Sequence, residues 1–353
     1  MSEFYIGNKK VGGQNKPYCI AEVGINHNGD LACAKKMIEE AKKAGADAVK
    51  FQTFKAEEFC GDENQLFTYF SQGIEITESM LDMFKRYEFT KDEWLEIKRY
   101  CQKQDITFFS TPQNRSDLDL LLELGVPAIK IGSDDFTNLP LISSYANVSL
   151  PLILSCGMSN LAEVHLALEA AGWFKGKEIA LMLCTSQYPT PPEDVNILKI
   201  NTLKNSFPGL IIGFSDHTQD ALAASLAVAL GSTIFEKHFT LDHNLPGPDH
   251  WFSDTPEQLA NWINCIHKSF KMRGSPLLIP TEKEYQMRTL ARRSIVALKD
   301  IMNGETLNVS NVGLRRPGNG LPPVMYEEIL GTIASKSIKK GSLISLKDIK
   351  YDT

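Results

Sequence analysis

The chain is predicted to fold as an α/β protein built around a (β/α)8 TIM barrel, and three observations support this. Short, almost continuously apolar runs alternate with longer amphipathic stretches along residues 1–272. Eight such runs occur, and strands that are apolar throughout are typical of a parallel sheet covered by helices. No Gly-x-Gly-x-x-Gly motif follows the first run, which argues against an open nucleotide-binding sheet.

Each predicted strand is rich in β-branched and other apolar residues. The eight runs are 18–23, 48–51, 107–110, 128–131, 152–155, 179–183, 210–213 and 233–236. Helical patterns lie between them. In Leu31–Gly45, for example, apolar residues recur at helical spacing and a glycine closes the helix. Asn160 and Thr218 are predicted to cap the helices that follow them.

The pattern changes after residue 272. A segment without strong periodicity of apolar residues comes first, and from residue 292 the pattern predicts short strands and turns. We therefore expect a catalytic barrel over 1–272, a linker over 273–291 and a small domain over 292–353. A domain of that size buries a marginal core alone, so we expect it to dock on the barrel or on a partner subunit.

Composition and charge exclude several classes of protein. The 353 residues are 43% hydrophobic and 23% charged, and the net charge is −6 without a basic tract, so neither nucleic acid nor an anionic membrane is an expected partner. No apolar run is long enough to span a membrane, and the N-terminus lacks the apolar core of a secretory signal. The seven cysteines, without a Cys-x-x-Cys pair, indicate a reducing, cytoplasmic setting without disulfides.

Polar residues follow the predicted strands at the end where a barrel of this kind places its active site. Unpaired polar groups are costly to bury, so core filling alone explains this set poorly. The residues, in strand order, are Glu22, Asn26 and His27; Lys50 and Gln52; Ser110 and Thr111; Lys130, Ser133, Asp134 and Asp135; Ser155; Thr185, Ser186, Gln187 and Tyr188; Ser215, Asp216 and His217; and Glu236, Lys237 and His238.

Two histidines, His217 and His238, end consecutive predicted strands and are therefore expected to share one rim. Two imidazoles completed by water and substrate oxygens form a sparse site typical of Mn²⁺, Fe²⁺, Co²⁺ or Zn²⁺. Asp249 could add a ligand or contact a sugar. The alternative is that each histidine only forms a hydrogen bond near the rim.

Lys50 and Lys130, with hydroxyls from several strands, predict a pocket for an anion such as a phosphate with a carboxylate. Taken singly, each lysine could instead form a salt bridge or extend its charge to solvent. Glu22 is a candidate general base, or a group that positions water. A glutamate at this position could equally be a salt-bridge partner.

These residues and their flanking motifs closely resemble the sialic acid synthase family, whose members condense phosphoenolpyruvate with an N-acylated amino sugar. The resemblance covers nearly the whole chain in order. The matching strings are AEVGINHNG (21–29), VKFQTF (49–54), FFSTP (108–112), IKIGSDD (129–135), LSCGMS (154–159), CTSQYPTPPEDVN (184–196), GFSDHT (213–218), EKHFT (236–240), LPGPDH (245–250) and RRPGNG (315–320).

The resemblance implies a (β/α)8 barrel followed by a C-terminal antifreeze-like (SAF, β-clip) domain, swapped across a homodimer. It also implies a transferase that forms a nine-carbon 2-keto-3-deoxy acid of the sialic acid type and phosphate. The implied cofactor is Mn²⁺, with Mg²⁺ or Co²⁺ as alternatives, bound by His217 and His238. Glu22 matches the acidic catalytic residue of the family, and Lys50 is expected to act in catalysis beside it.

The implied substrate-binding residues come from most strands of the barrel and from the last domain. Those matched to phosphoenolpyruvate are Lys50, Thr111, Lys130, Ser133, Ser155 and Ser215, and those matched to the sugar are Tyr188 and Asp249. Gln52, Asp135 and Ser186 are further expected contacts. Arg316 matches the arginine that reaches from the antifreeze-like domain to the acyl group in the partner's barrel.

Two positions depart from the family pattern. Bacterial members often have Gly-Glu where this chain has Asp134–Asp135, and Ser186 stands where an asparagine is common. Both changes affect the identity of the sugar more than the reaction. N-acetylmannosamine or a related sugar is the expected substrate, and a legionaminic acid synthase that uses 2,4-diacetamido-2,4,6-trideoxymannose is the alternative.

Other functions stay open from the sequence. A pseudaminic-type substrate is disfavoured because IKIGSDD does not resemble the motif of that subgroup. An aldolase could form a Schiff base through Lys50 or Lys130, although the paired histidines favour metal chemistry. A non-catalytic protein could bind a glycan or ice through its C-terminal domain, but it would not need so many reactive residues in the barrel.

Overall fold

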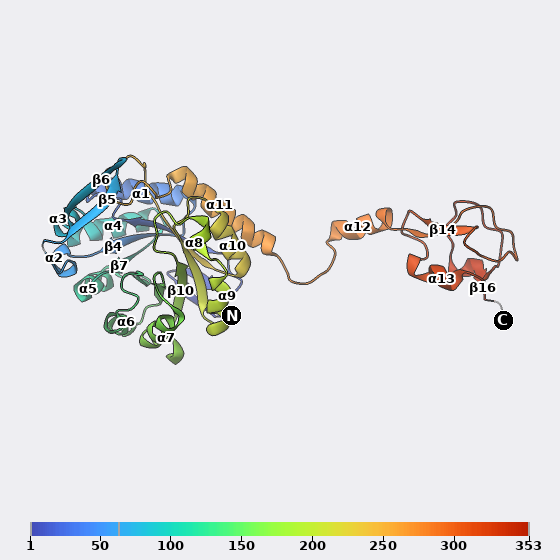
Figure 1. Cartoon of the computed structure of the whole chain (residues 1–353), viewed down its shortest axis with the longest axis horizontal. Helices are drawn as coiled ribbons and strands as arrows, with labels where there is room; N and C mark the ends of the chain where they lie inside the picture. The colour runs from blue at the N-terminus through green and yellow to red at the C-terminus, as the bar shows by residue number, and fades with distance from the viewer. Residues whose placement is uncertain (1, 63, 352–353) are drawn as a thin grey trace. The chain divides into compact units, whose positions relative to one another are not determined.

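The computed structural model describes residues 2–62 and 64–351. It divides into two compact units, Met1–Gly274 and Ser275–Thr353, which are described separately below (Figure 1). Among the described residues, no helix is both long and apolar enough to cross a membrane. All seven cysteines are free thiols.

Eight parallel strands form the centre of the first unit. They are β3 (Tyr18–Gly24), β4 (Ala48–Thr53), β7 (Thr107–Pro112), β8 (Ile129–Ile131), β9 (Leu152–Ser155), β10 (Ile179–Cys184), β11 (Ile211–Asp216) and β12 (Ile234–His238). Their order is β7-β4-β3-β12-β11-β10-β9-β8, and β7 and β8 also approach each other closely. The sheet therefore curves into the predicted barrel, and each of the eight sequence runs corresponds to a strand.

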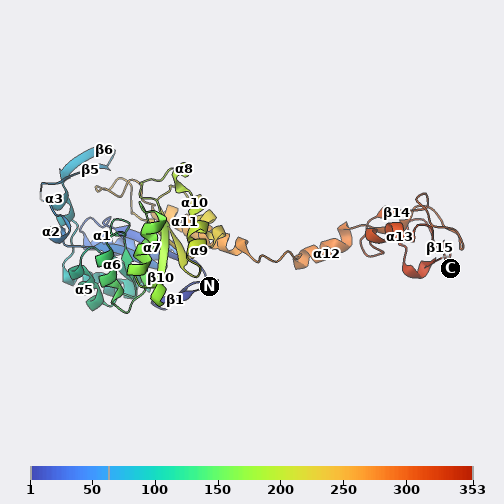
Figure 2. The ribbon, with the colours of Figure 1, turned by 60° about the horizontal axis from the view of Figure 1, so that its bottom comes forward.

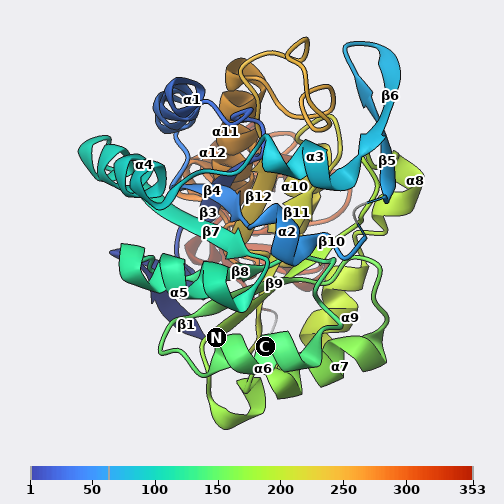
Figure 3. The same ribbon diagram turned by 90° about the vertical axis from the view of Figure 1, so that its left-hand side faces the viewer.

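Helices surround this sheet (Figure 3). They are α1 (Leu31–Ala44), α4 (Lys91–Lys103), α5 (Arg115–Leu124), α6 (Leu139–Ala146), α7 (Leu161–Ala170), η1 (Trp173–Lys175), α8 (Pro192–Val195), α9 (Lys199–Ser206), α10 (Leu222–Leu230) and α11 (Pro256–Arg273). Asp30 caps the first turn of α1, and Gly45 ends it in the left-handed region with φ 92°, where a side chain would be strained. Local capping and apolar periodicity thus explain where this helix begins and ends.

The two caps predicted from the sequence differ in outcome. Asn160 caps α7, because its side chain accepts hydrogen bonds from the backbone N–H groups of Ala162 and Glu163. Thr218 does not cap α10, which begins only at Leu222. The Thr218 hydroxyl instead donates to Asp216, at 2.7 Å, so a contact within the turn after β11 takes the place of the predicted cap.

Two β-hairpins add to the barrel. The first pairs β1 (Glu3–Ile6) with β2 (Lys9–Gly12), and the second pairs β5 (Leu66–Ser71) with β6 (Ile74–Ser79). The second hairpin lies with α2 (Ala56–Phe59) and α3 (Met80–Lys85) in an insertion between β4 and α4, and it projects from the barrel (Figure 2). The strands predicted from the sequence do not include those of this insertion.

The core of the first unit lies on both sides of the strands. Phe51, Phe108, Phe235 and Trp262 are among the largest side chains that are completely buried. Phe235 and Trp262 meet edge to face, with ring centres 6.4 Å apart, where β12 packs on α11. Burial on both faces explains why the strands read as continuous apolar runs rather than as alternating ones.

The second unit begins with α12 (Glu282–Ala291), which occupies part of the segment expected as a linker. Its remaining elements are β13 (Ser294–Ala297), β14 (Val312–Arg315), η2 (Pro323–Met325), α13 (Tyr326–Ile329), β15 (Ile333–Ala334), η3 (Leu346–Asp348) and β16 (Ile349–Lys350). A separate small apolar core holds this unit together, and Ile295, Leu307, Val312 and Ile344 are its completely buried members of β13, β14 and the connecting loops.

Candidate functional site

A cavity of about 470 Å³ lies at the carboxyl ends of the barrel strands. This volume falls within the range of small-molecule sites. Thirteen of the predicted site residues line it: Glu22, Lys50, Gln52, Thr111, Lys130, Ser133, Ser155, Ser186, Tyr188, Ser215, His217, His238 and Asp249. The barrel therefore brings together residues that are more than 200 positions apart in the sequence.

Strand register explains why these side chains meet. Glu22 on β3 lies opposite both Lys50 on β4 and His238 on β12. Ser215 on β11 lies opposite Glu236 on β12 in the same way. Residues in register on parallel strands sit at the same height in a barrel, so Glu22, Lys50 and His238 form one layer. Ser215 and Glu236 form the layer two residues earlier along β12.

Four charged side chains form a buried network at the base of the cavity. Lys50 Nζ lies 2.8 Å from Glu22 Oε2 and 3.8 Å from Glu236 Oε1, and Lys130 Nζ lies 3.4 Å from Glu236 Oε1. Lys50 also donates a hydrogen bond to the Thr111 hydroxyl at 3.1 Å. Burying charges is costly, so a protein keeps such a network either by pairing every group or for a function.

Several buried polar atoms around this network form no hydrogen bond within the protein. They are Glu236 Oε2, the hydroxyl oxygens of Ser155 and Ser186, and Nδ1 of His238. Each of these atoms lies in a residue that lines the cavity. Because unsatisfied buried groups are expensive, their concentration in one cavity marks it as a place where a polar ligand binds.

The two carboxyl groups of the network have different electrostatic surroundings. Burial raises the pKa of Glu22 to about 7 even though Lys50 lowers it, and the neighbouring Glu236 raises it further. Burial would also raise the pKa of Glu236, but Lys130 and Lys50 together hold it below its ordinary value. A pair whose pKa values are pushed apart in this way provides one carboxyl that can exchange a proton near neutral pH and one that stays ionised.

The two imidazoles have their ring centres 5.3 Å apart. His217 Nδ1 lies 2.7 Å from the Thr185 carbonyl oxygen and donates to it, which leaves Nε2 as the nitrogen with a free lone pair. His238 Nδ1 forms no hydrogen bond and lies 3.9 Å from the Asp249 carboxylate. These nitrogen donors, one oriented by a backbone carbonyl and one unsatisfied, fit the expected divalent cation.

The protein alone supplies few ligands for such a cation. Within residues 2–62 and 64–351, no group of three or more His, Cys, Asp or Glu side chains is arranged to hold a metal ion by itself. A cation held by His217 and His238 would therefore need water and substrate oxygens to complete its coordination, as the sequence predicts.

Tyr188 forms the part of the cavity wall next to the histidines. Its ring centre lies 4.2 Å from that of His217 and 5.6 Å from that of His238. Phe252 contacts the same tyrosine, with ring centres 5.0 Å apart. An aromatic ring with a hydroxyl, placed beside the Asp249 carboxylate, is suited to a polar organic molecule such as a sugar.

The structure differs from the sequence expectation at the end of β8. Asp135 does not line the cavity, and the neighbouring Asp134 lines it instead. The Asp135 carboxylate accepts a hydrogen bond from the side chain of Asn138 at 3.0 Å, just before α6. The turn after β8 rotates successive side chains in different directions, and spacing in the sequence does not reveal which one faces the cavity.

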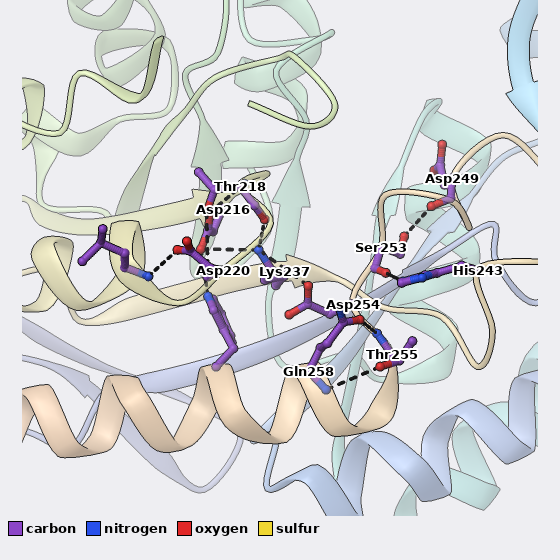
Figure 4. Close-up of polar contacts among 12 residues, drawn as sticks. Asp216, Thr218, Asp220, Lys237, His243, Asp249, Ser253, Asp254, Thr255 and Gln258 are labelled. Carbon is purple, nitrogen blue, oxygen red and sulfur yellow. Dashed lines mark hydrogen bonds and ion pairs between the residues drawn. The ribbon is translucent and has the colours of Figure 1, made fainter. Parts of the chain in front are cut away.

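Two other residues at the strand ends, Asp216 and Lys237, point away from the cavity. Figure 4 shows Lys237 between Asp216 and Asp254, with distances from its Nζ of 3.6 and 3.8 Å. Trp262 of α11 donates a hydrogen bond to Asp216 at 2.8 Å. These charges therefore lie between the strands and the covering helix, where they have a structural role.

Sequence reasoning missed several cavity residues. Glu236 was recognised as a strand-end residue, but its pairing with both lysines depends on barrel closure. A group of apolar side chains also lines the cavity, most of them from the insertion between β4 and α4. This group is Ile25, Phe54, Phe59, Phe67, Met83 and Phe84. Their sequence pattern is that of ordinary core residues, so no local signal distinguishes them.

The last predicted site residue, Arg316, belongs to the second unit. It is exposed and directly follows β14.

Comparisons with known proteins give a consistent result. A profile of the NeuB family matches residues 37–277, and a profile of the SAF domain matches residues 292–350. An N,N'-diacetyllegionaminic acid synthase from Campylobacter jejuni is 40% identical over 93% of this chain and 99% of its own length. A pseudaminic acid synthase from Helicobacter pylori is 33% identical over 95% of this chain and 98% of its own length.

Solved structures agree with the sequence relatives. The crystal structure of an N-acetylneuraminic acid (sialic acid) synthetase from Leptospira borgpetersenii superposes with a TM-score of 0.73 at 36% identity. The similarity covers 81% of this chain and 95% of the other. The resemblance inferred from the motifs is thereby confirmed. The chain belongs to the NeuB family, whose relatives named here are acid synthases, and it ends in a SAF domain.

Proposed function

We propose that this protein condenses phosphoenolpyruvate with the open-chain aldehyde of an N-acylated amino sugar, giving a nine-carbon 2-keto-3-deoxy acid and phosphate. The observation that carries the proposal is the pair of buried lysines, Lys50 and Lys130, at the base of a cavity that also holds two imidazoles. Two fixed cations suit a substrate with both a phosphate and a carboxylate. The three relatives described above are each named as an acid synthase or synthetase, which supports the same reaction.

Phosphoenolpyruvate would bind at the base of the cavity. Lys50 and Lys130 supply charge, and the hydroxyl groups of Thr111, Ser155 and Ser215 supply hydrogen bonds. The Ser155 hydroxyl forms no hydrogen bond in the protein and is therefore available to an anion. Holding the substrate at several fixed points aligns its C3 carbon with the aldehyde, an effect that can lower a barrier by about 7–11 kcal/mol in ideal cases.

The reaction forms one carbon–carbon bond and breaks one carbon–oxygen bond. C3 of phosphoenolpyruvate attacks the aldehyde carbon, and the aldehyde oxygen becomes a hydroxyl by taking a proton from solvent. Water adds at C2 and gives one proton to Glu22. Phosphate then leaves with the C2–O bond electrons and takes the remaining proton of the C2 hydroxyl as the ketone forms. A Glu22 pKa of about 7 suits this proton transfer near neutral pH.

His217 and His238 would hold a divalent cation, Mn²⁺ in the first instance and Mg²⁺ or Co²⁺ as alternatives. When bound, such a cation supplies Lewis-acid polarisation of the sugar carbonyl. Tyr188 and Asp249 lie beside the two histidines and would position the sugar there. The two candidate sugars are N-acetylmannosamine and a diacetamido-trideoxy relative of it.

A Schiff-base mechanism is the alternative enzyme reaction, and the surroundings of Lys50 disfavour it. Burial favours the neutral amine, but Glu22 and Glu236 raise the pKa of Lys50 above its ordinary value. An imine-forming lysine must be neutral to attack a carbonyl. Lys50 is therefore better suited to holding an anion.

The direct test of the proposed function is phosphate release from phosphoenolpyruvate on addition of an amino sugar and Mn²⁺. We expect release that depends on all three components and a product with one ketone per phosphate. Borohydride in the presence of substrate should trap no covalent adduct. A protein that binds the sugars without releasing phosphate from phosphoenolpyruvate would contradict the proposal and favour the glycan-binding alternative.

We further propose that the SAF domain completes the site of a partner subunit in a homodimer, with Arg316 contacting the acyl group of the sugar. Arg316→Ala is then expected to raise the KM for the sugar about tenfold or more and to leave the KM for phosphoenolpyruvate within about twofold, because a charge-assisted contact is lost on one substrate only. The neighbouring exposed Arg315 provides the matched control, Arg315→Ala. Equal changes in both KM values would argue against this role.

A further inference from the structure

The cavity has two chemically different walls. Polar side chains come from the segments that follow β8 and β10, including Ser133, Ser186 and Tyr188. Only carbon-rich side chains come from the insertion between β4 and α4 and from Ile25 after β3. In the strand order, β10 lies four places from β4, so the segment after β10 and the insertion after β4 face each other across the barrel.

Aromatic residues of the insertion pack into a continuous surface. Phe84 contacts Phe54 and Phe59 edge to face, with ring centres 5.1 and 5.0 Å apart. Phe54 and Met83 are buried, whereas Phe59, Phe67 and Phe84 are half-buried and keep part of their surface for the cavity. The interlocked rings make the surface rigid, and a rigid apolar surface selects ligands by shape and polarity.

From this surface we infer a determinant of substrate specificity: the wall formed by Ile25, Phe54, Phe59, Phe67, Met83 and Phe84, called here the aromatic wall, receives methyl-bearing groups of the sugar. The inference rests on the function proposed above. It names the substrate class as an amino sugar in which a deoxy carbon and a second acylamido group replace hydroxyls far from the aldehyde. N-acetylmannosamine, with hydroxyls at those places, fits the wall less well.

The physical reason is desolvation. A hydroxyl placed against the aromatic wall loses its bonds to water and finds no partner among carbon atoms. A methyl group in the same place is removed from water favourably. Apolar pockets distinguish substrates that differ by one such group by about 10- to 200-fold, so we expect a preference in this range.

Two sugars compared on the wild-type protein test the inference without any variant. Phosphate release is measured at saturating phosphoenolpyruvate with 2,4-diacetamido-2,4,6-trideoxymannose and with N-acetylmannosamine. We expect kcat/KM to be at least about tenfold higher for the first sugar, with the difference mainly in KM. Release with both sugars at equal efficiency, or a preference for N-acetylmannosamine, would overturn the inference and leave the proposed function intact. No release with either sugar would instead overturn the proposed function.

A matched pair of variants on β5 assigns the preference to the wall. Phe67 lines the cavity, whereas the adjacent Leu66 is 65% exposed on the other face of the hairpin. We expect Phe67→Gln to reduce the preference about tenfold by raising the KM for the diacetamido sugar, with the KM for phosphoenolpyruvate unchanged. Leu66→Gln should retain the wild-type preference. An unchanged preference in a folded Phe67→Gln protein, as judged by thermal unfolding, would contradict the assignment; if that variant does not fold, the wild-type comparison decides.

Discussion

Strands β11 and β12 carry buried polar or charged side chains on both of their faces, and the two faces differ in how completely the protein satisfies the hydrogen bonds of these side chains. Ser215 and Glu236 face the cavity, whereas the next residues along each strand, Asp216 and Lys237, face α11. On the helix side, Asp216 accepts bonds from Thr218 and Trp262, and Lys237 donates to the Thr218 carbonyl oxygen. On the cavity side, Glu236 Oε2 has no hydrogen-bond partner.

This difference separates stability from function. Charges that are fully satisfied by the protein fix the position of a helix on a sheet. Charges that are left partly unsatisfied reduce stability, and a protein tolerates them where they bind a substrate. Buried charges on the helix side and on the cavity side of the barrel strands should therefore respond in opposite ways to substitution. Lys237 and Lys130 provide one buried lysine on each side.

The largest expected effect is on the helix side. Lys237→Met leaves the carboxylates of Asp216 and Asp254 buried without their shared cation and should lower the free energy of unfolding by about 3–5 kcal/mol. Chemical denaturation measures this change. The kcat/KM of the protein that remains folded should be largely retained. A variant of wild-type stability would show that the helix-side charges are not structural.

The matching change on the cavity side is Lys130→Met. It removes a cation from the proposed phosphoenolpyruvate site and should lower kcat/KM for that substrate by about 100- to 1,000-fold, because a charge-assisted contact is lost. Denaturation should show a much smaller change than for Lys237→Met, since Glu236 keeps Lys50 as a partner. If Lys130→Met instead loses stability and keeps activity, the contrast between the two faces is wrong.

The metal proposal is tested by His217→Ala. We expect kcat to fall about 100-fold or more and added Mn²⁺ not to restore it, because one of two nitrogen ligands is gone. Direct titration with Mn²⁺ provides a readout besides activity and should show weakened binding. His165 is an exposed histidine on α7, so His165→Ala is the control. Full activity of the His217→Ala protein in EDTA would exclude a metal at this position.

A smaller expected effect concerns the pH dependence of stability and arises from Asp117, a buried acid outside the cavity. Its carboxylate accepts hydrogen bonds from Asn114 at the start of α5. Burial raises its pKa to about 6 from 3.8, so the folded state binds more protons than the unfolded state between these values. Its contribution to stability is therefore present below about pH 4 and is lost as pH rises to about 6.

Asp117→Asn removes this titration. We expect the free energy of unfolding of the variant to rise by about 2–3 kcal/mol relative to that of the wild type between pH 4 and pH 6. Denaturation at each pH measures this difference. The exposed Asp119 lies on the same helix, and Asp119→Asn should show no such trend. A constant difference between Asp117→Asn and the wild type across this range would contradict the expectation.

Much of the barrel could be predicted from the sequence because its signals are local. The run that became β10, for instance, is apolar throughout, and helices such as α7 begin at capping residues such as Asn160. The candidate site followed from one general rule, that the carboxyl ends of barrel strands carry the reactive residues.

The errors arose where direction or distance in space mattered. Asp135 was expected in the cavity and Asp134 occupies that place, because a turn after a three-residue strand does not preserve alternation. Thr218 was expected as a helix cap and binds Asp216 instead. In each case the conformation of a turn set the direction of the side chain, and the residue types alone do not specify that conformation.

The sequence by itself determined the strands, the order of chemical groups along them and the family of the chain, because these depend on short-range patterns and on motifs. Only the tertiary structure decided which of two adjacent charged residues faces the cavity, that Glu236 bridges two lysines, and that an insertion supplies an aromatic wall. The physical reason is that strands buried on both faces are largely apolar on both. Their sequence therefore does not show which face lines the cavity and which packs on the helices, because barrel closure determines this.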